Sequence, residues 1–269
     1  MFELRTNPVL CQNINNTHLQ VIYYGRGLVD SNWRGEVLNP VYSRLYYIVS
    51  GEGSKMIQDS NEVVLEPGNW YLFPAGCSFS YSCVDKLDHI YFHLKLCDVD
   101  GIDLLHGCQN PIRSPGNRED DVEFFTKGLE CYGVMEGLQI RHRIFEVLLS
   151  MLDTEGLTLE SKKLSPCVLR AIHFIRGNLS IQLSTAQIAE AAEISESTLT
   201  KRFRRELTMS VHDYVANLVF SEAVTLLRES DLSVMSISER YGFCDQFYFS
   251  RRFKEKIGSA PRNFRKVFV

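Results

Sequence analysis

The C-terminal part of the chain contains one pattern twice, 50 residues apart. Residues 199–205 read Leu-Thr-Lys-Arg-Phe-Arg-Arg, and residues 249–255 read Phe-Ser-Arg-Arg-Phe-Lys-Glu. The apolar positions recur at a spacing of four in both copies, at Leu199, Phe203 and Leu207 and at Phe249, Phe253 and Ile257. This spacing marks one buried face of a helix, so the basic residues between these positions lie on the opposite face. The pattern predicts two amphipathic helices, each with a cationic outer surface.

A shorter segment with helical character precedes each basic helix. In the first copy, Ser184 and Gln187 have the spacing of a capping box. In the second copy, the corresponding segment begins at Ser233 and leads to Gly242. Gly242 suits the positive φ of a tight turn between helices, whereas the first copy has Glu193 there and needs a turn that tolerates a side chain.

The second helix of each pair is expected to begin at a capping residue. Ser195 has this place in the first copy, and either Cys244 or Asp245 has it in the second. A short helix, a tight turn and a basic second helix form a helix-turn-helix. Two such units at a fixed offset favour DNA binding over an all-α repeat whose charges are merely solvated.

The charge distribution supports the same interpretation. Residues 164–269 contain 15 Lys and Arg against 11 Asp and Glu, whereas residues 1–163 contain 14 against 22. A basic C-terminal domain beside an acidic N-terminal domain suits a protein that contacts DNA at one end only.

The second unit also resembles a known family. Residues 242–254 (Gly-Phe-Cys-Asp-Gln-Phe-Tyr-Phe-Ser-Arg-Arg-Phe-Lys) and the segment from Gly258 to Arg265 are similar to the signature of AraC/XylS-type bacterial transcription regulators. The resemblance covers residues 165–269 closely. It implies a double helix-turn-helix domain that binds double-stranded DNA, a homodimer, contact with RNA polymerase, and a place in the cytoplasm.

Three residues depart from the pattern of that family. Ser238 replaces the usual Ala, Thr208 replaces a frequent Gly, and Val219 replaces a frequent Arg of the linking helix. We expect the first two changes to cost little. The third removes a charge that would help to brace the helix from Ser210 to about Glu229, in which Tyr214, Leu218 and Leu226 recur on the apolar side.

The resemblance also distributes roles among the polar residues of the two basic helices. Major-groove contacts to base edges are expected from Ser197, Thr200, Lys201, Gln246, Ser250 and Arg251. Phosphate contacts, which position the protein without specifying sequence, are expected from Arg204, Arg205 and Lys254. Arg202 and Arg252 are expected to pack or pair within the domain instead.

The N-terminal half has a different character. Short apolar segments separated by Gly and Pro turns predict strands at 19–24, 44–49, 55–58, 62–65, 70–73 and 89–96. The spacing Gly68…Pro74-Ala-Gly76 resembles the second motif of cupins, which are small jelly rolls. Phe79 stands where metal cupins have a His, so no metal is expected. His89 and His93, which share one strand face, are a weaker alternative for a metal site.

A jelly roll without metal is expected to enclose a cavity lined by side chains. Alternation along the strand places Arg44 and Tyr46 on one face, and they are candidates to hold a polar ligand. Trp33 and Trp70 are candidates to stack on a sugar ring. The alternatives are a position at the rim for Arg44 and in the core for both tryptophans.

The middle of the chain is expected to be a loop at 97–117 followed by helices at 118–133 and 136–153, with a break near Gly133 and Gly137. These helices either pack on the barrel or form a dimer interface, as in the resembled family. Ser165 and Pro166 suit the start of the next helix. The predicted organisation is α+β, with a cupin-like ligand-sensing domain at 1–117, a helical dimerisation hairpin and linker at 118–164, and the double helix-turn-helix domain at 165–269.

The sequence therefore predicts a ligand-responsive transcription regulator, an activator of a carbohydrate-utilisation operon, with a sugar as its inducer. No catalytic constellation, cofactor motif, signal peptide or membrane-spanning stretch is apparent in it. Two alternatives stay open at this point. One is a regulator whose barrel binds a protein partner and no small molecule, and the other is a cupin enzyme fused to a DNA-binding tail.

Overall fold

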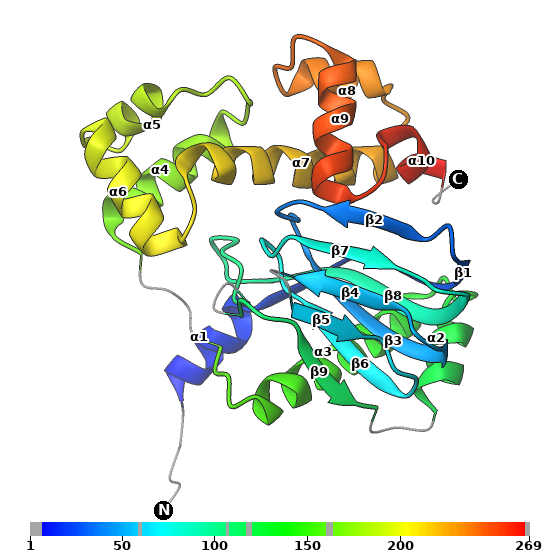
Figure 1. Ribbon diagram of the computed structural model, residues 1–269. Coiled ribbons are helices and arrows are strands. Elements are labelled where there is room, and N and C mark those ends of the chain that lie inside the picture. The colour runs from blue at the N-terminus through cyan, green and yellow to red at the C-terminus, as the bar shows by residue number, and fades with distance from the viewer. Residues whose placement is uncertain (1–6, 59–60, 106–107, 117–119, 160–163, 267–269) are drawn as a thin grey trace, which may run out of the picture. The chain divides into compact units, whose positions relative to one another are not determined.

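The computed structural model describes residues 7–58, 61–105, 108–116, 120–159 and 164–266 (Figure 1). The chain divides into two compact units, which are treated separately below. The N-terminal unit comprises Met1–Gly35 and Tyr42–Ser161, and the C-terminal unit comprises Glu36–Val41 and Lys162–Val269. The first is built on β-sheets with helices, and the helix-turn-helix part from residue 164 is all α, so the predicted α+β class is confirmed. The predicted cuts at 117 and 164 stay predictions, since residues 117–119 and 160–163 lie outside the described ranges.

Two antiparallel sheets form the N-terminal unit. Sheet A has the order β1 (His18–Asp30), β8 (Lys86–Cys97), β3 (Ser43–Gly51), β6 (Asn69–Phe73), β9 (Ile112–Pro115). Sheet B has the order β2 (Arg34–Val37), β7 (Phe79–Ser82), β4 (Lys55–Gln58), β5 (Asn61–Val64). Among the first eight strands, every consecutive pair except the β4–β5 hairpin changes sheet, as in a jelly roll, and the predicted β domain is confirmed.

The structure adds elements that sequence patterns did not predict. β2, β7 and β9 were not predicted, and each has four residues. β9 lies within the segment expected to be a loop, and that expectation was wrong: Ile112 pairs with Leu72 at the edge of sheet A. Helix α1 (Pro8–Asn16) was also missed, although Asn7 caps it by accepting a hydrogen bond from the Leu10 amide at 3.0 Å.

Helices α2 (Asp121–Gly128) and α3 (Val134–Thr154) cover one face of sheet A. The core between them includes Trp70, Phe92, Phe125, Ile144 and Leu148. The predicted pair of helices is present, but α2 is shorter than expected. The break also lies elsewhere than expected: Gly133 occupies the N-cap of α3, and Gly137 lies inside that helix.

The C-terminal unit contains the helices α4 (Pro166–Gly177), α5 (Thr185–Ala191), α6 (Glu196–Leu207), α7 (Val211–Glu229), α8 (Val234–Arg240), α9 (Gln246–Ile257) and α10 (Pro261–Lys266). The long helix α7 matches the predicted linking helix. Its buried face includes Tyr214, but Leu218 and Leu226 are only half-buried, because the interior side is formed by residues such as Val219 and Phe220. Val219, which replaces the frequent Arg, is thus a core residue.

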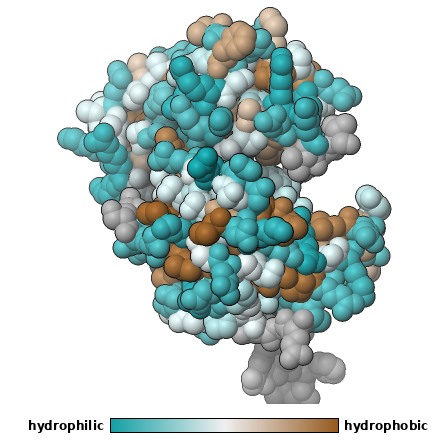
Figure 2. Space-filling model, turned by 45° about the vertical axis from the view of Figure 1, so that its right-hand side comes forward, coloured by the Kyte–Doolittle hydropathy of each residue, from teal (hydrophilic) through white to brown (hydrophobic). Residues whose placement is uncertain are grey.

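The surface is mixed rather than uniformly polar. Figure 2 shows hydrophilic side chains over most of the visible face, with apolar residues gathered in its lower half. Within the described ranges, no helix is both long and apolar enough to cross a lipid bilayer.

Candidate nucleic-acid interface and ligand sites

Side-chain caps begin the four helices of the two helix-turn-helix units. Ser184 and Gln187 form the predicted capping box at α5. Ser195 caps α6 by accepting from the Thr198 amide at 3.3 Å, and Ser233 caps α8 in the same way. At α9 the cap is Asp245 and not Cys244, since its carboxylate accepts the amides of Phe247 and Tyr248, each at 3.0 Å. Each pair of helices is therefore fixed locally by short polar residues at the starts of its helices.

The turns between the paired helices have the expected backbone. Gly242 has φ of 78° and Glu193 has φ of 57°, so the first unit does place a side chain in a left-handed turn. A Cβ atom at Gly242 would come within 2.5 Å of the Ser180 hydroxyl, so a residue without a side chain is also favoured here on steric grounds. The buried hydroxyl of Ser238 donates to the Met235 carbonyl at 2.8 Å, which supports the expectation that this residue costs little.

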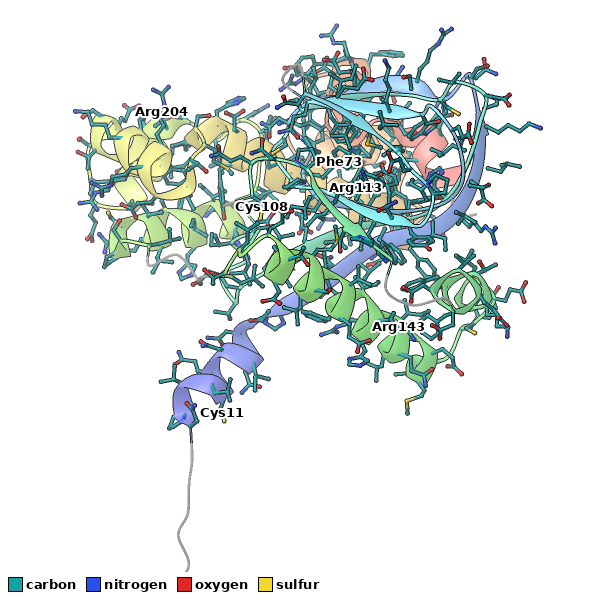
Figure 3. The ribbon with its side chains drawn as sticks, turned by 60° about the horizontal axis from the view of Figure 1, so that its bottom comes forward. Cys11, Phe73, Cys108, Arg113, Arg143 and Arg204 are labelled. Atoms are coloured by element: carbon teal, nitrogen blue, oxygen red, sulfur yellow. The ribbon has the colours of Figure 1, made fainter. Side chains whose placement is uncertain are left out.

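The predicted DNA-contacting residues share one face on each second helix. On α6 this face carries Ser197, Thr200, Lys201 and Arg204. On α9, positions 50 residues later carry Phe247, Ser250, Arg251 and Lys254. The helical spacing of three and four residues places each set on one side, and the Arg204 side chain extends outward from α6 (Figure 3). Gln246 is half-buried at the start of α9 beside this face.

Phe247 is the residue of this face that the sequence interpretation missed. Its side chain is 75% exposed in the first turn of α9. The signal was available, because Phe247 lies 50 residues after Ser197, which was selected. An exposed phenylalanine with no core to fill suits apolar contact with the methyl group of thymine in the major groove.

Several arginines beside this face pair within the domain. Arg252 donates to Glu255 at 2.8 Å, and Arg202 lies 3.4 Å from Glu206, as expected for these two residues. Arg205, predicted to contact phosphate, lies 2.9 Å from the same Glu206 carboxylate. The Arg251 guanidinium stacks over the Tyr248 ring at 5.4 Å, which orients it while leaving it exposed.

Glu206 also revises one expectation about helix α4. Ser165 occupies the N-cap of α4, but its hydroxyl donates to Glu206 at 3.1 Å instead of capping the helix. Burial raises the pKa of the Glu206 carboxyl, but hydrogen bonds from Ser165 and Arg205 outweigh this effect and hold it below its usual value. Ser165 therefore ties the start of α4 to the end of α6.

In the N-terminal unit, Arg44 is an interior residue and not a rim residue. It is 3% exposed, and its guanidinium lies 5.5 Å from the centre of the Tyr42 ring and 5.1 Å from that of Phe79. Because Phe79 belongs to β7 of sheet B, Arg44 projects into the space between the sheets. Tyr46 is buried nearby, and burial raises the pKa of its hydroxyl.

Two buried histidines share this interior. His93 lies opposite Arg44 in the sheet register, and burial, with the nearby Arg44 charge, holds the His93 pKa well below its usual value. Burial lowers the pKa of His89 to about 4. Both imidazoles are therefore neutral at pH 7. Across the described ranges, no group of three His, Cys, Asp or Glu residues is arranged to hold a metal ion.

The two tryptophans lie on opposite faces of sheet A. Trp33 contacts the rings of Tyr81 and His89 at 4.5 and 5.6 Å, on the side that faces sheet B. Trp70 packs against Tyr47 and Phe125 under the helices. The structure therefore places Arg44, Tyr46 and Trp33 on the side of sheet A that faces sheet B. Trp70 lies on the opposite side, under the helices. Ligand binding by any of the four stays a prediction.

Comparison with known proteins gives matches to both parts of the chain. A family model described as a helix-turn-helix domain matches residues 188–267. The xylose operon regulatory protein of Haemophilus influenzae is 31% identical over 100 residues, 37% of this chain and 26% of that relative. The Msm operon regulatory protein of Streptococcus mutans is 22% identical over 265 residues, 94% of this chain and 95% of that relative. The match thus spans about a quarter of the first relative and nearly all of the second.

Among solved structures, ToxT from Vibrio cholerae has a similar fold. The apo form has a TM-score of 0.64 at 12% identity, covering 91% of this chain and 98% of that chain. A form bound to an unsaturated fatty acid has a TM-score of 0.62 at 12% identity, covering 94% and 96%. At this identity the likeness shows the fold alone.

Two capped helix-turn-helix units, joined in one chain to a two-sheet β domain, are an arrangement that suits a DNA-binding regulator. The family model identifies residues 188–267 as a helix-turn-helix domain, which agrees with the resemblance of this part of the chain to AraC/XylS-type regulators.

Proposed function

We propose that this regulator responds to a small molecule and activates transcription of a carbohydrate-utilisation operon. The observation that carries the proposal is the matched pair of exposed faces on α6 and α9, which have the same residue spacing at an offset of 50. The relatives named above regulate a xylose operon and an Msm operon, and this supports a sugar-related target.

The geometry of the C-terminal unit supports simultaneous contact with two grooves. The linking helix α7 has 19 residues and hence a length of about 28 Å. Successive major grooves on one side of B-DNA are about 34 Å apart. A rigid linker of this size suits two basic helices that enter adjacent grooves, where Arg251 would meet guanine and Gln246 adenine.

The test is binding of the full-length protein to fragments of its own upstream DNA, measured at several salt concentrations. We expect affinity to fall steeply with salt, because Lys and Arg contacts displace counterions from phosphates. Transcription from the same promoter in a reporter strain, with and without the regulator gene, then separates activation from repression. Affinity that does not change with salt, or lower transcription when the regulator is present, would count against the proposal.

For the N-terminal unit, we propose that Arg44 and Tyr46, with Trp33 nearby, bind the inducer between the two sheets. The supporting observation is a permanent positive charge buried among aromatic rings between the sheets, which would attract the oxygen atoms of a polar ligand.

We propose a homodimer in which α3 contacts its counterpart. Exposed apolar residues on α3 include Met135, Leu138 and Leu149. Their spacing, with the half-buried Phe145 between them, approaches the alternating three and four of a coiled-coil seam. Sedimentation should show a dimer for the native protein and a monomer for Leu138→Glu. A dimer that survives this change would place the interface elsewhere. RNA polymerase is the further partner that activation requires.

A further inference from the structure

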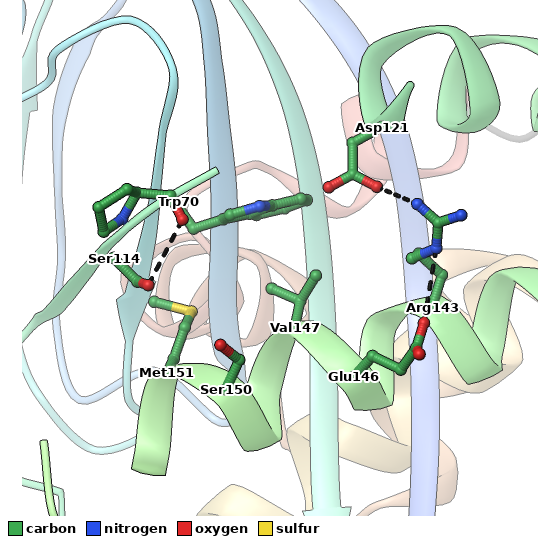
Figure 4. Close-up of a pocket in the computed structure, with 9 residues that line it drawn as sticks. Trp70, Ser114, Asp121, Arg143, Glu146, Val147, Ser150 and Met151 are labelled. Carbon is green, nitrogen blue, oxygen red and sulfur yellow. Dashed lines mark hydrogen bonds and ion pairs between the residues drawn. The ribbon is translucent and has the colours of Figure 1, made fainter. Parts of the chain in front are cut away.

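A cavity lies between helix α3 and the helix-facing side of sheet A, within the N-terminal unit (Figure 4). Its volume is about 260 Å³. A single buried water occupies about 30 Å³, whereas pockets for drug-sized ligands have about 300–1,000 Å³. The space therefore suits one small molecule.

The cavity has one polar group that the protein does not satisfy. Trp70 is 2% exposed, and its indole nitrogen is buried without a hydrogen-bond partner among the described residues. A buried tryptophan N–H normally finds an acceptor. Hydroxyl groups also line this cavity. Ser114 is buried on β9, pairs with Trp70 in the strand register, and donates a long hydrogen bond of 3.5 Å to the Pro115 carbonyl. Ser150 of α3 lines the opposite side.

The charges beside the cavity exclude one class of ligand. The Arg143 guanidinium is bonded to the buried Asp121 and lies 3.5 Å from Asp120 and 3.6 Å from Glu146. One cation among three carboxylates leaves this end negative, so an anionic ligand would be repelled. Glu146 also lines the cavity and offers carboxylate oxygens to hydroxyl donors.

We propose that this cavity binds a small, neutral, polyhydroxylated molecule of about monosaccharide size. A ligand hydroxyl oxygen accepts from the Trp70 indole, and other hydroxyls bond to Ser114, Ser150 and Glu146. The C–H face of the ligand packs on the apolar wall that includes Val147 and Met151. This site is distinct from the Arg44 cluster, which lies on the other face of sheet A.

The two tryptophans provide the experiment, because the chain contains only two. In full-length Trp33→Phe, Trp70 is the sole tryptophan, and in Trp70→Phe the sole one is Trp33. Each protein is titrated with D-glucose, D-xylose, L-rhamnose and glycerol, then with D-gluconate as an anion and protonated D-glucosamine as a cation. We expect a saturable change in the emission of Trp70 with at least one neutral probe, and none with gluconate.

Binding to the variants is measured by calorimetry. Loss of one hydrogen bond should weaken binding about 2- to 10-fold in Trp70→Phe and in Ser150→Ala. Gln139→Ala, at an exposed position of α3 outside both the cavity and the proposed dimer seam, serves as the matched control and should bind normally. Should Trp70→Phe fail to fold, Val147→Phe fills the cavity and should abolish binding.

Three results would overturn the proposal. They are a response of Trp33 without one of Trp70, preferential binding of gluconate or glucosamine, and no response of Trp70 to any neutral probe. DNA affinity measured on the same proteins keeps this test separate from the proposed regulatory function, since none of these variants touches the C-terminal unit.

Discussion

Thr208 and Gly258 are equivalent residues that end α6 and α9 in the same left-handed backbone. Their φ angles are 58° and 90°. Glycine adopts this conformation without strain, whereas a β-branched residue rarely does. The left-handed backbone of Thr208 argues against the expectation that this residue costs little, whereas its hydroxyl donates locally to the Leu207 carbonyl at 2.6 Å.

We expect Thr208→Gly to raise the free energy of unfolding by about 1 kcal/mol, because it removes strain at the helix end. The matched change Gly258→Ala should lower it by about 1 kcal/mol, since it introduces a side chain at positive φ. Urea denaturation of the full-length protein measures both. If Thr208→Gly is neutral or destabilising, the local hydrogen bond of Thr208 offsets its backbone strain.

Arg251 and Lys254 should differ in how they affect DNA recognition. Arg251→Ala should cost about 1–3 kcal/mol for the preferred site and relax one base position, because arginine reads guanine with two hydrogen bonds. Lys254→Ala should weaken binding to all sequences about equally, because a phosphate contact carries no base information. Selection from a randomised DNA library with each variant measures this difference. An equal loss of specificity in Arg251→Ala and Lys254→Ala would show that the assignment of Arg251 to a base and Lys254 to a phosphate is wrong.

Sequence alone was enough to choose residues that share one outer face on each second helix, because the spacing of buried residues in α6 and α9 determines which side chains point outward. DNA contact by these residues stays a prediction. It missed Phe247, because a phenylalanine in an apolar pattern is usually assigned to the core. It also did not separate Trp33 from Trp70, since which face of a sheet a residue occupies depends on strand register and on what covers each face.

At the scale of elements, Lys256 joins α9 to α7 and is buried. Its ammonium group donates to Asn217 at 3.1 Å. Burial lowers the pKa of Lys256 to about 8, although the nearby Asp213 carboxylate partly raises it. Arg252 lowers the pKa further, and Glu255 raises it. Between about pH 8 and 10.5 the unfolded chain keeps this proton and the folded protein releases it. The free energy of unfolding should therefore rise with pH across this window.

Lys256→Met should remove this part of the pH dependence, which is at most about 3 kcal/mol. Lys254→Met, at an exposed position of the same helix, is the control and should retain it. Chemical denaturation at pH 7 and pH 10 gives the comparison. The same pH dependence in Lys256→Met and the native protein would show that Lys256 is not the titrating group.

The helices were predicted better than the strands for a physical reason. A helix shows its buried face within a few turns of contiguous sequence, as the copies 199–207 and 249–257 do. A four-residue strand such as β9 is stabilised by pairing with β6, which is distant in sequence, so its own residues carry little signal. The residues at which α2 and α3 begin and end were also hard to predict, because they depend on how these helices pack against sheet A.

At the scale of the whole molecule, the two units have separate roles that must be coupled for regulation. The class and the jelly-roll order followed from motifs, whereas the cavity under α3 could not, because it arises from how helices meet a sheet. We expect Arg44→Ala to abolish the response to inducer while operator affinity stays unchanged, because Arg44 and the DNA-contacting faces belong to different units.

A reporter driven by the native promoter, with operator affinity measured in parallel, tests this expectation. Arg113→Ala, at an exposed position of β9, is a suitable control and should respond normally. Normal induction in the Arg44→Ala strain would exclude the interior between the sheets as the site of inducer action.

Helix α7 fixes the distance and the relative rotation between the two helix-turn-helix units, and so it also fixes the spacing of the two DNA elements that they can contact together. One residue inserted into its middle would rotate α8 and α9 by about 100° relative to α5 and α6 and move them by about 1.5 Å. Such a rotation would turn Arg251 and its neighbours away from the groove far more than the small shift would displace them. Operators that separate their two recognition elements by one base pair more or fewer would also be misaligned, since each base pair adds a turn of about 34° and a rise of about 3.4 Å. The chain can therefore change which bases it reads one residue at a time, but it cannot change the distance between them gradually.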